Sequence, residues 1–241
     1  MQGYDGIAEW YDQCVRAHSM LHDTVIDTLL ALADEVSGLD LCDLACGQGV
    51  VAREVAKRGA ASVCGIDLSA KLLAIAREEE RREPLGILYM QEDAQSLSSF
   101  SDGLFDGVLC NLALMDIADL SATAYTIQRI LRPGGWLIFS ILHPCAPVTS
   151  AEGSLQPRPL SYFEEGLWFS SNPLSVRGRV GSYHRQVSTY LQSFLDAGLK
   201  LEEIREPQAR GPIVERIPAY TSVPVALVAR FSKPASALGP L

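Results

Sequence analysis

Residues 39–57, LDLCDLACGQGVVAREVAK, place an apolar run, a glycine turn and a helical repeat in direct succession. The apolar run 39–46 is interrupted only by Asp40 and Asp43, which is typical of a strand buried on both faces of a parallel sheet. Gly47 and Gly49 let the backbone turn sharply and approach a ligand without a Cβ in the way. The following helix N-terminus offers unpaired N–H groups and a positive dipole. The stretch therefore predicts a strand–turn–helix crossover of the nucleotide-binding kind.

Residues 39–57 alone do not identify the ligand that binds at this turn. Gly47-x-Gly49-x-x-Ala52 fits the relaxed dinucleotide pattern, and Asp67 lies twenty residues beyond Gly47, where a ribose-binding acid would be placed. A tight strand–helix turn without any ligand gives the same short pattern. The rest of the chain must decide whether a nicotinamide dinucleotide, another cofactor or no ligand binds here.

Composition limits the class of protein. The chain has 241 residues, 48% of them hydrophobic, and a formal net charge of −9. A large core is therefore expected, and a nucleic-acid partner is disfavoured because phosphate binding needs a basic surface. The sequence shows neither a signal peptide nor an apolar run long enough to span a membrane. Six cysteines without a CxxC pair favour a reduced, cytoplasmic protein with no metal site.

Strands and helices alternate along most of the chain, which predicts a doubly wound, Rossmann-like parallel sheet. The last two strands have no helix between them, so they should be antiparallel to each other, and one strand of the seven should run against the sheet. Residues 1–37 should form a helical cap on a single domain covering 1–241. The expected strands are 39–46, 61–67, 86–90, 105–110, 136–142, 199–205 and 223–231, and the expected helices are 3–18, 22–36, 50–57, 70–82, 120–131 and 188–197.

Residues 143–183 interrupt this alternation. They contain many prolines, serines and glycines together with the large aromatic residues Tyr162, Phe163, Trp168 and Phe169. A loop of this length within a compact domain is usually a lid or a binding segment. We therefore expect an insertion that covers the substrate.

The order of several short motifs resembles the class I S-adenosylmethionine-dependent methyltransferases. The resemblance covers essentially residues 1–231. It departs from the family at one position, where Ala45 stands in place of the first glycine of the acidic–glycine loop. The matching motifs are Asp43-x-Ala45-x-Gly47-x-Gly49, Asp67 after the second strand, Asp93-Ala94 after the third strand and Leu131-Arg132-Pro133-Gly134-Gly135 before the fifth strand.

The resemblance implies an S-adenosylmethionine site at the carboxyl edge of the sheet, where open sheets bind ligands. Asp67 is expected on the ribose and Asp93 on the adenine amino group. The aromatics of the N-terminal cap either close over the cofactor or pack as its core. The expected cofactor-binding residues are Tyr4, Tyr11, Asp43, Ala45, Gly47, Gly49, Asp67, Leu68, Asp93, Ala94, Asn111 and Leu112.

The acceptor side is less defined by the sequence. His143 and His184 flank the insertion and are candidate general bases, although an ordinary polar residue at an element boundary is the better explanation of each taken alone. The expected substrate-binding residues are Met115, Tyr162, Trp168 and Tyr183.

These expectations describe an enzyme that transfers a methyl group to an O, N or C nucleophile of a small molecule by in-line displacement. It should act as a monomer or homodimer, with no metal. An NAD-dependent oxidoreductase and a non-catalytic S-adenosylmethionine-binding protein are the two alternatives.

Overall fold

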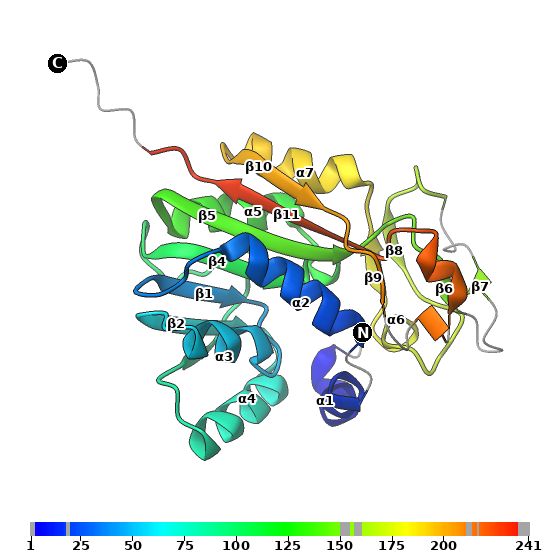
Figure 1. Ribbon diagram of the computed structural model, residues 1–241, viewed down its shortest axis with the longest axis horizontal. Coiled ribbons are helices and arrows are strands. Elements are labelled where there is room, and N and C mark those ends of the chain that lie inside the picture. The colour runs from blue at the N-terminus through cyan, green and yellow to red at the C-terminus, as the bar shows by residue number, and fades with distance from the viewer. Residues whose placement is uncertain are drawn as a thin grey trace.

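The computed structural model describes residues 3–17, 20–149, 155–156, 161–210, 214–215 and 217–235. Its centre is a seven-stranded sheet in the order β10-β11-β5-β4-β1-β2-β3 (Figure 1). β11 is antiparallel to both β5 and β10, and the other neighbouring strands are parallel. This confirms the predicted mostly parallel sheet with one antiparallel strand. The strands are β1 (Asp40–Leu44), β2 (Ser62–Asp67), β3 (Leu88–Gln91), β4 (Phe105–Asn111), β5 (Leu131–Leu142), β10 (Lys200–Arg205) and β11 (Ala226–Ser232).

Helices cover both faces of the sheet, so its central strands are apolar on both sides. On one face α2 (Met20–Ala33), α3 (Val50–Lys57) and α4 (Ala70–Arg82) pack against the sheet in a cluster that includes Leu29 and Leu41. On the other face lie α5 (Leu120–Ile130) and α7 (Val187–Asp196). There the ring of Phe139 stacks on those of Phe194 and Phe231, with centroids 5.0 and 6.0 Å apart. No helix in the described part of the chain is both long and apolar enough to cross a membrane.

β5 begins at Leu131, earlier than the predicted start at residue 136. Gly134, with φ 83°, and Gly135 both pair with Lys233, the residue that follows β11. Gly134 donates to the Lys233 carbonyl at 2.9 Å, and Lys233 donates to the Gly135 carbonyl at 2.8 Å. The Pro133-Gly134-Gly135 motif therefore belongs to β5 because it pairs with a segment distant in the sequence. Local sequence does not encode that pairing.

The insertion is more regular than the sequence predicts. It contains the short strands β6 (Val148–Thr149), β7 (Leu155–Gln156), β8 (Gly166–Trp168) and β9 (Ser182–His184) and the one-turn helix α6 (Val176–Arg179). β6 pairs with β7 and β8 with β9, both antiparallel. Leu167 is the partner of Tyr183 in the second ladder, so these two side chains share one face.

The N-terminal cap consists of the 3-10 turn η1 (Tyr4–Gly6), α1 (Ala8–Ala17) and α2. α1 lies beside α4, at the same end of the sheet as α6 and β9 (Figure 1). The described part of the cap therefore extends past the sheet to its carboxyl edge.

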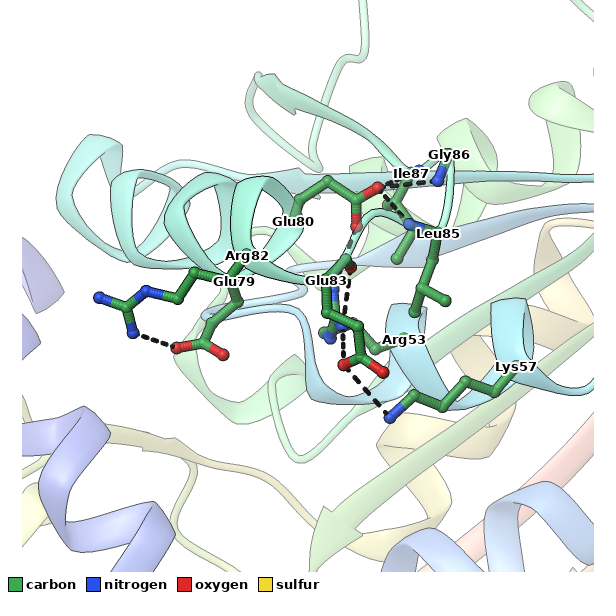
Figure 2. Close-up of polar contacts among 9 residues, drawn as sticks. All are labelled: Arg53, Lys57, Glu79, Glu80, Arg82, Glu83, Leu85, Gly86 and Ile87. Atoms are coloured by element: carbon green, nitrogen blue, oxygen red, sulfur yellow. Dashed lines mark hydrogen bonds and ion pairs between the residues drawn. The ribbon is translucent and has the colours of Figure 1, made fainter.

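A partly buried network of charges joins α3 to α4 (Figure 2). Arg53 donates to Glu80 at 3.1 Å and to the Glu83 carbonyl at 3.0 Å, and it also pairs with the Glu83 carboxylate. The other oxygen of Glu80 accepts three backbone N–H groups, those of Leu85, Gly86 and Ile87, at 2.7, 2.7 and 3.2 Å. The network fixes the helix that begins at the glycine turn against the helix that begins after β2.

Candidate functional site

A cavity of about 560 Å³ opens at the carboxyl edge of the sheet. Its walls come from the ends of β1, β2 and β4, from the N-terminal cap and from the insertion. The described lining residues include carboxylates but no lysine, arginine or histidine. The predicted site residues that line it are Tyr4, Tyr11, Ala45, Gly47, Asp67, Leu68, Asp93, Ala94, Asn111, Leu112 and Tyr183.

Asp67 and the glycine turn form one hydrogen-bonded unit. The Gly47 N–H donates to Asp67 Oδ2 and the Ser69 N–H to Oδ1, each at 2.8 Å. Burial raises the pKa of Asp67, and these two N–H groups counteract the shift. Each carboxylate oxygen keeps one further lone pair for a ligand hydroxyl.

Two residues other than glycine hold left-handed backbone on this wall. Ala45 has φ 55° and Leu112 has φ 52°. The Leu112 N–H donates to Ser140 Oγ at 2.8 Å, and Ser140 Oγ–H donates to Asn111 Oδ1 at 2.7 Å. Such a conformation is costly for a residue with a Cβ and is concentrated at binding sites. Ala45 therefore holds a conformation that glycine adopts without this cost.

Asp43 and Gly49 were expected at the cofactor, but neither is among the described lining residues. The Ala52 N–H donates to Asp43 Oδ2 at 2.8 Å, so Asp43 fixes the first turn of α3, and burial raises its pKa to about 7. Gly49 has φ 83°, and a Cβ there would lie 2.3 Å from the Tyr89 hydroxyl. Both residues shape the turn from behind the cavity wall.

Two aromatic rings of the N-terminal cap line the cavity. Tyr4 and Tyr11 pack edge to face, with centroids 5.1 Å apart. Between them Asp5 is tied to the start of α4, because it accepts from Ser69 Oγ–H at 2.6 Å and from the Lys71 N–H at 3.1 Å. The cap is thereby fastened beside Asp67.

Asp116 and Arg177 form an ion pair at the cavity that the sequence analysis did not identify. Asp116 ends the 3-10 turn η2 (Leu114–Asp116) after β4, and Arg177 belongs to α6. The Tyr4 hydroxyl donates to Asp116 Oδ2 at 3.0 Å, across 112 residues of sequence. Three cavity walls therefore meet at this pair. The only local signal was an acidic residue within the otherwise apolar segment 112–118.

Strand alternation displaces the predicted acceptor wall by one residue. Leu167 and Tyr183 line the cavity, whereas Trp168 is 4% exposed and lines a separate cavity of about 180 Å³. Neither Tyr162 nor Met115 is among the lining residues. The Tyr162 hydroxyl instead accepts from the Val187 N–H at 3.2 Å. Of the four predicted substrate-binding residues, only Tyr183 is among the described residues that line the cavity.

Neither candidate histidine lines the cavity. His143 accepts from the Cys145 N–H at Nδ1, 3.1 Å away, and its Nε2 lies 2.9 Å from Glu206 Oε1. His184 is 2% exposed and directs Nε2 to the Tyr162 carbonyl at 3.1 Å. Both are occupied by structural contacts outside the cavity, so the geometry does not place either to take a proton from an acceptor inside it.

Comparison with known proteins agrees with this architecture. Residues 42–139 match a family model described as a methyltransferase domain. The crystal structure of an S-adenosylmethionine-dependent methyltransferase from Mesorhizobium loti is 29% identical, covers 95% of this chain and 100% of that one, and has a TM-score of 0.70. The chain is a class I S-adenosylmethionine-dependent methyltransferase.

Other relatives extend the comparison. A solved structure from Listeria monocytogenes is 26% identical to this methyltransferase, covers 88% of this chain and 99% of that one, and has a TM-score of 0.73. A protein named ubiquinone biosynthesis O-methyltransferase from Methylococcus capsulatus is 29% identical over 191 residues, which is 73% of this chain and 80% of the relative. The oxidoreductase and non-catalytic alternatives are not favoured.

The cavity fits S-adenosylmethionine by its chemistry. That cofactor carries a positive sulfonium, and the described lining offers carboxylates without any competing cation. Asp67 beside the glycine turn, with free lone pairs, is suited to a pair of ribose hydroxyls. Asp93 is available for the adenine amino group.

Proposed function

We propose that this methyltransferase O-methylates a hydroxyl group of a small, neutral molecule. The observation that carries the proposal is the charge of the cavity. Its described lining includes Asp5, Asp67, Glu92, Asp93 and Asp116 and no cationic side chain. A phosphate or carboxylate on the acceptor would find no partner there and would be repelled. The names of the ubiquinone biosynthesis relatives support a hydroxyl as the methyl acceptor.

Each wall has a proposed part in this reaction. Asp67 holds the ribose, Asp93 and Ala94 hold the adenine, and the backbone at Gly47 lies against the methionine portion. When bound, S-adenosylmethionine supplies a methyl group already activated by a positive sulfur. The residues of this chain then need only align the acceptor and exclude water. Tyr183 and Leu167 are proposed to contact the acceptor.

The remaining features of the proposal concern the whole protein. We infer one methyltransferase domain in which residues 1–37 and 143–183 close the cavity. The net charge of −9 supports an enzyme that does not bind nucleic acid, and the six cysteines without a CxxC pair support a cytoplasmic one. A monomer or a homodimer is proposed as the active form.

The test is a product assay with purified protein. Methyl-labelled S-adenosylmethionine is incubated with phenol, catechol and aliphatic alcohols, and in parallel with size-matched amines and carboxylic acids. We expect a labelled methyl ether and an equal amount of S-adenosylhomocysteine with at least one neutral hydroxyl acceptor. Product from amines or carboxylic acids alone, or from no acceptor, would reject the proposed O-methylation.

A further inference from the structure

The position of Asp116 separates it from the carboxylates at the cofactor end of the cavity. Asp67 follows β2, and Glu92 and Asp93 follow β3, on one side of β1. Asp116 follows β4, on the other side of β1. Its neighbours in the cavity lining include Gly181, Ser182 and Tyr183 of the insertion. Asp116 therefore lies where the insertion meets the cavity.

The other lining carboxylates are directed to the cofactor end of the cavity or fasten the N-terminal cap. Asp67 accepts two backbone N–H groups and faces the ribose position. Asp93 accepts from the backbone N–H of Gln95 at 2.9 Å and from its side chain at 3.0 Å. Asp5 is fastened to the start of α4. This leaves Asp116 as the lining carboxylate on the insertion side of the described cavity.

The carboxylate of Asp116 keeps capacity for a further hydrogen bond. Arg177 occupies Oδ1 and the Tyr4 hydroxyl donates to Oδ2. A carboxylate has about four lone-pair sites, so each oxygen can accept once more. The Asp116 side chain is 20% exposed, which leaves it accessible from the cavity.

The segment that carries Asp116 is held rigidly. Arg185 donates to the carbonyls of Leu114, Ile117 and Ala118 at 3.2, 2.7 and 2.7 Å. Ser182 Oγ–H donates to the Met115 carbonyl at 3.3 Å. Arg185 and Ser182 thus fix the backbone on both sides of Asp116. A group that acts on a reacting atom must be held in place in this way.

We propose that Asp116 is the general base that takes the proton from the hydroxyl of the acceptor, with Arg177 and Tyr4 holding its carboxylate in place; this rests on the proposed O-methylation. The acceptor O–H bond breaks and its proton passes to Asp116. The oxygen forms the new bond to the methyl carbon with the released electron pair. The carbon–sulfur bond breaks with its electrons left on sulfur, so a neutral thioether and a methyl ether result.

Several charged and titratable groups surround this carboxylate. Arg177 faces it from α6, Tyr4 and Tyr11 face it from the N-terminal cap, and Asp67 and Cys110 lie near enough to interact electrostatically. Burial raises the pKa of Asp116, and Arg177 lowers it in part. A carboxylate with a raised pKa is a stronger base than an exposed one.

The experiment compares Asp116→Asn with Asp119→Asn and Tyr4→Phe in the full chain. Asp119 is an exposed carboxylate three residues further on, whose side chain caps α5 by accepting from the Ala122 N–H at 2.8 Å, and asparagine caps a helix equally well. Turnover is measured with the hydroxyl acceptor that the wild-type enzyme methylates. S-adenosylmethionine binding is measured by calorimetry. Catechol binding is measured in the presence of S-adenosylhomocysteine, where no turnover occurs.

We expect Asp116→Asn to lower kcat by about 10²- to 10⁴-fold. Its S-adenosylmethionine Kd should stay within roughly threefold of the wild type, and catechol should bind about tenfold more weakly. The acid limb of the kcat/KM pH profile should disappear. Asp119→Asn should match the wild type in all measurements. Tyr4→Phe should lose far less turnover than Asp116→Asn, because the Asp116 carboxylate remains.

The opposite pattern would overturn the assignment. If cofactor affinity and turnover fall in parallel, or if Tyr4→Phe reproduces the loss, Asp116 only fastens the N-terminal cap. If Asp116→Asn does not fold because Arg177 is left unpaired, the double variant Asp116→Asn/Arg177→Gln removes both charges and should show the same loss of kcat. A wild-type enzyme that methylates only amines rejects the proposed O-methylation and with it the base.

Discussion

The Gly47 N–H donates to Asp67 Oδ2 at 2.8 Å, so the turn after β1 and the acid after β2 form a single preformed cradle. Two distant motifs are thereby held in register before any ligand binds. This relation carries the first prediction, since a change at Asp67 alters both the ligand contact and the turn.

Asp67→Ala should weaken S-adenosylmethionine binding about ten- to a hundred-fold. The lost hydrogen bonds to a charged acceptor are worth about 1.5–3 kcal/mol, and each 1.4 kcal/mol is tenfold in Kd. Calorimetric titration gives the affinity, and circular dichroism checks the fold. Asp27→Ala, on the exposed face of α2, is the matched control and should bind normally. Unchanged affinity in folded Asp67→Ala would exclude the ribose role.

Tyr11 should discriminate the charged cofactor from its neutral product. If its ring attracts the sulfonium by a cation–π interaction of about 0.5–2 kcal/mol, Tyr11→Leu should weaken S-adenosylmethionine binding roughly two- to thirtyfold. Binding of S-adenosylhomocysteine, which has no sulfonium, should change much less. Tyr11→Phe keeps the ring and should behave as the wild type. Equal losses for both ligands in Tyr11→Leu would mean that the ring only packs.

The sheet was predictable because its strands are encoded locally. Each central strand is a short apolar run, and no helix was expected between the last two strands, which predicted the antiparallel pair. The family resemblance placed Asp67, Asp93 and Ala94 at the cofactor, and all three line the cavity, while their contacts with ribose and adenine stay predictions. The missed features depend on pairing between distant segments. Trp168 was predicted on the acceptor wall, but register with β9 turns Leu167 to the cavity instead.

The Asp116–Arg177 pair shows the same limit. The two residues are 61 positions apart and meet only when α6 packs against the loop after β4. The acidic residue within the apolar segment 112–118 was a local signal for Asp116, but nothing in either local sequence indicates that the two residues pair. His143 and His184 were predicted at the cavity but do not line it. Their positions at element boundaries next to the sheet edge give no information on which way their side chains turn.

Asp43 should make the stability of the fold depend on pH. Burial raises its folded-state pKa to about 7, whereas an unfolded aspartate titrates near its ordinary value of 3.8. The folded state therefore binds the proton more tightly, so this contribution to stability is fully present below about pH 4. It is lost as pH rises toward 7, by up to about 1.4 kcal/mol per pH unit.

Urea unfolding of the wild type and of Asp43→Asn between pH 4 and pH 8 measures this effect. The asparagine oxygen can still accept the Ala52 N–H, so the turn is kept. Asp67 and Asp116 also have raised pKa values, but they titrate in both proteins. The free energy of unfolding of the wild type should fall relative to the variant across this range. Parallel curves would show that Asp43 does not titrate there.

The α3–α4 network provides the last prediction, with a control one residue away on the same helix (Figure 2). Glu80→Ala should lower the free energy of unfolding by about 2–4 kcal/mol, because it leaves three backbone N–H groups and part of Arg53 without their acceptor. Glu79→Ala removes an exposed contact with Arg82 and should change stability by about 0.5 kcal/mol or less. Urea unfolding compares the two. Equal effects would mean that the network is as weak as an ordinary surface ion pair.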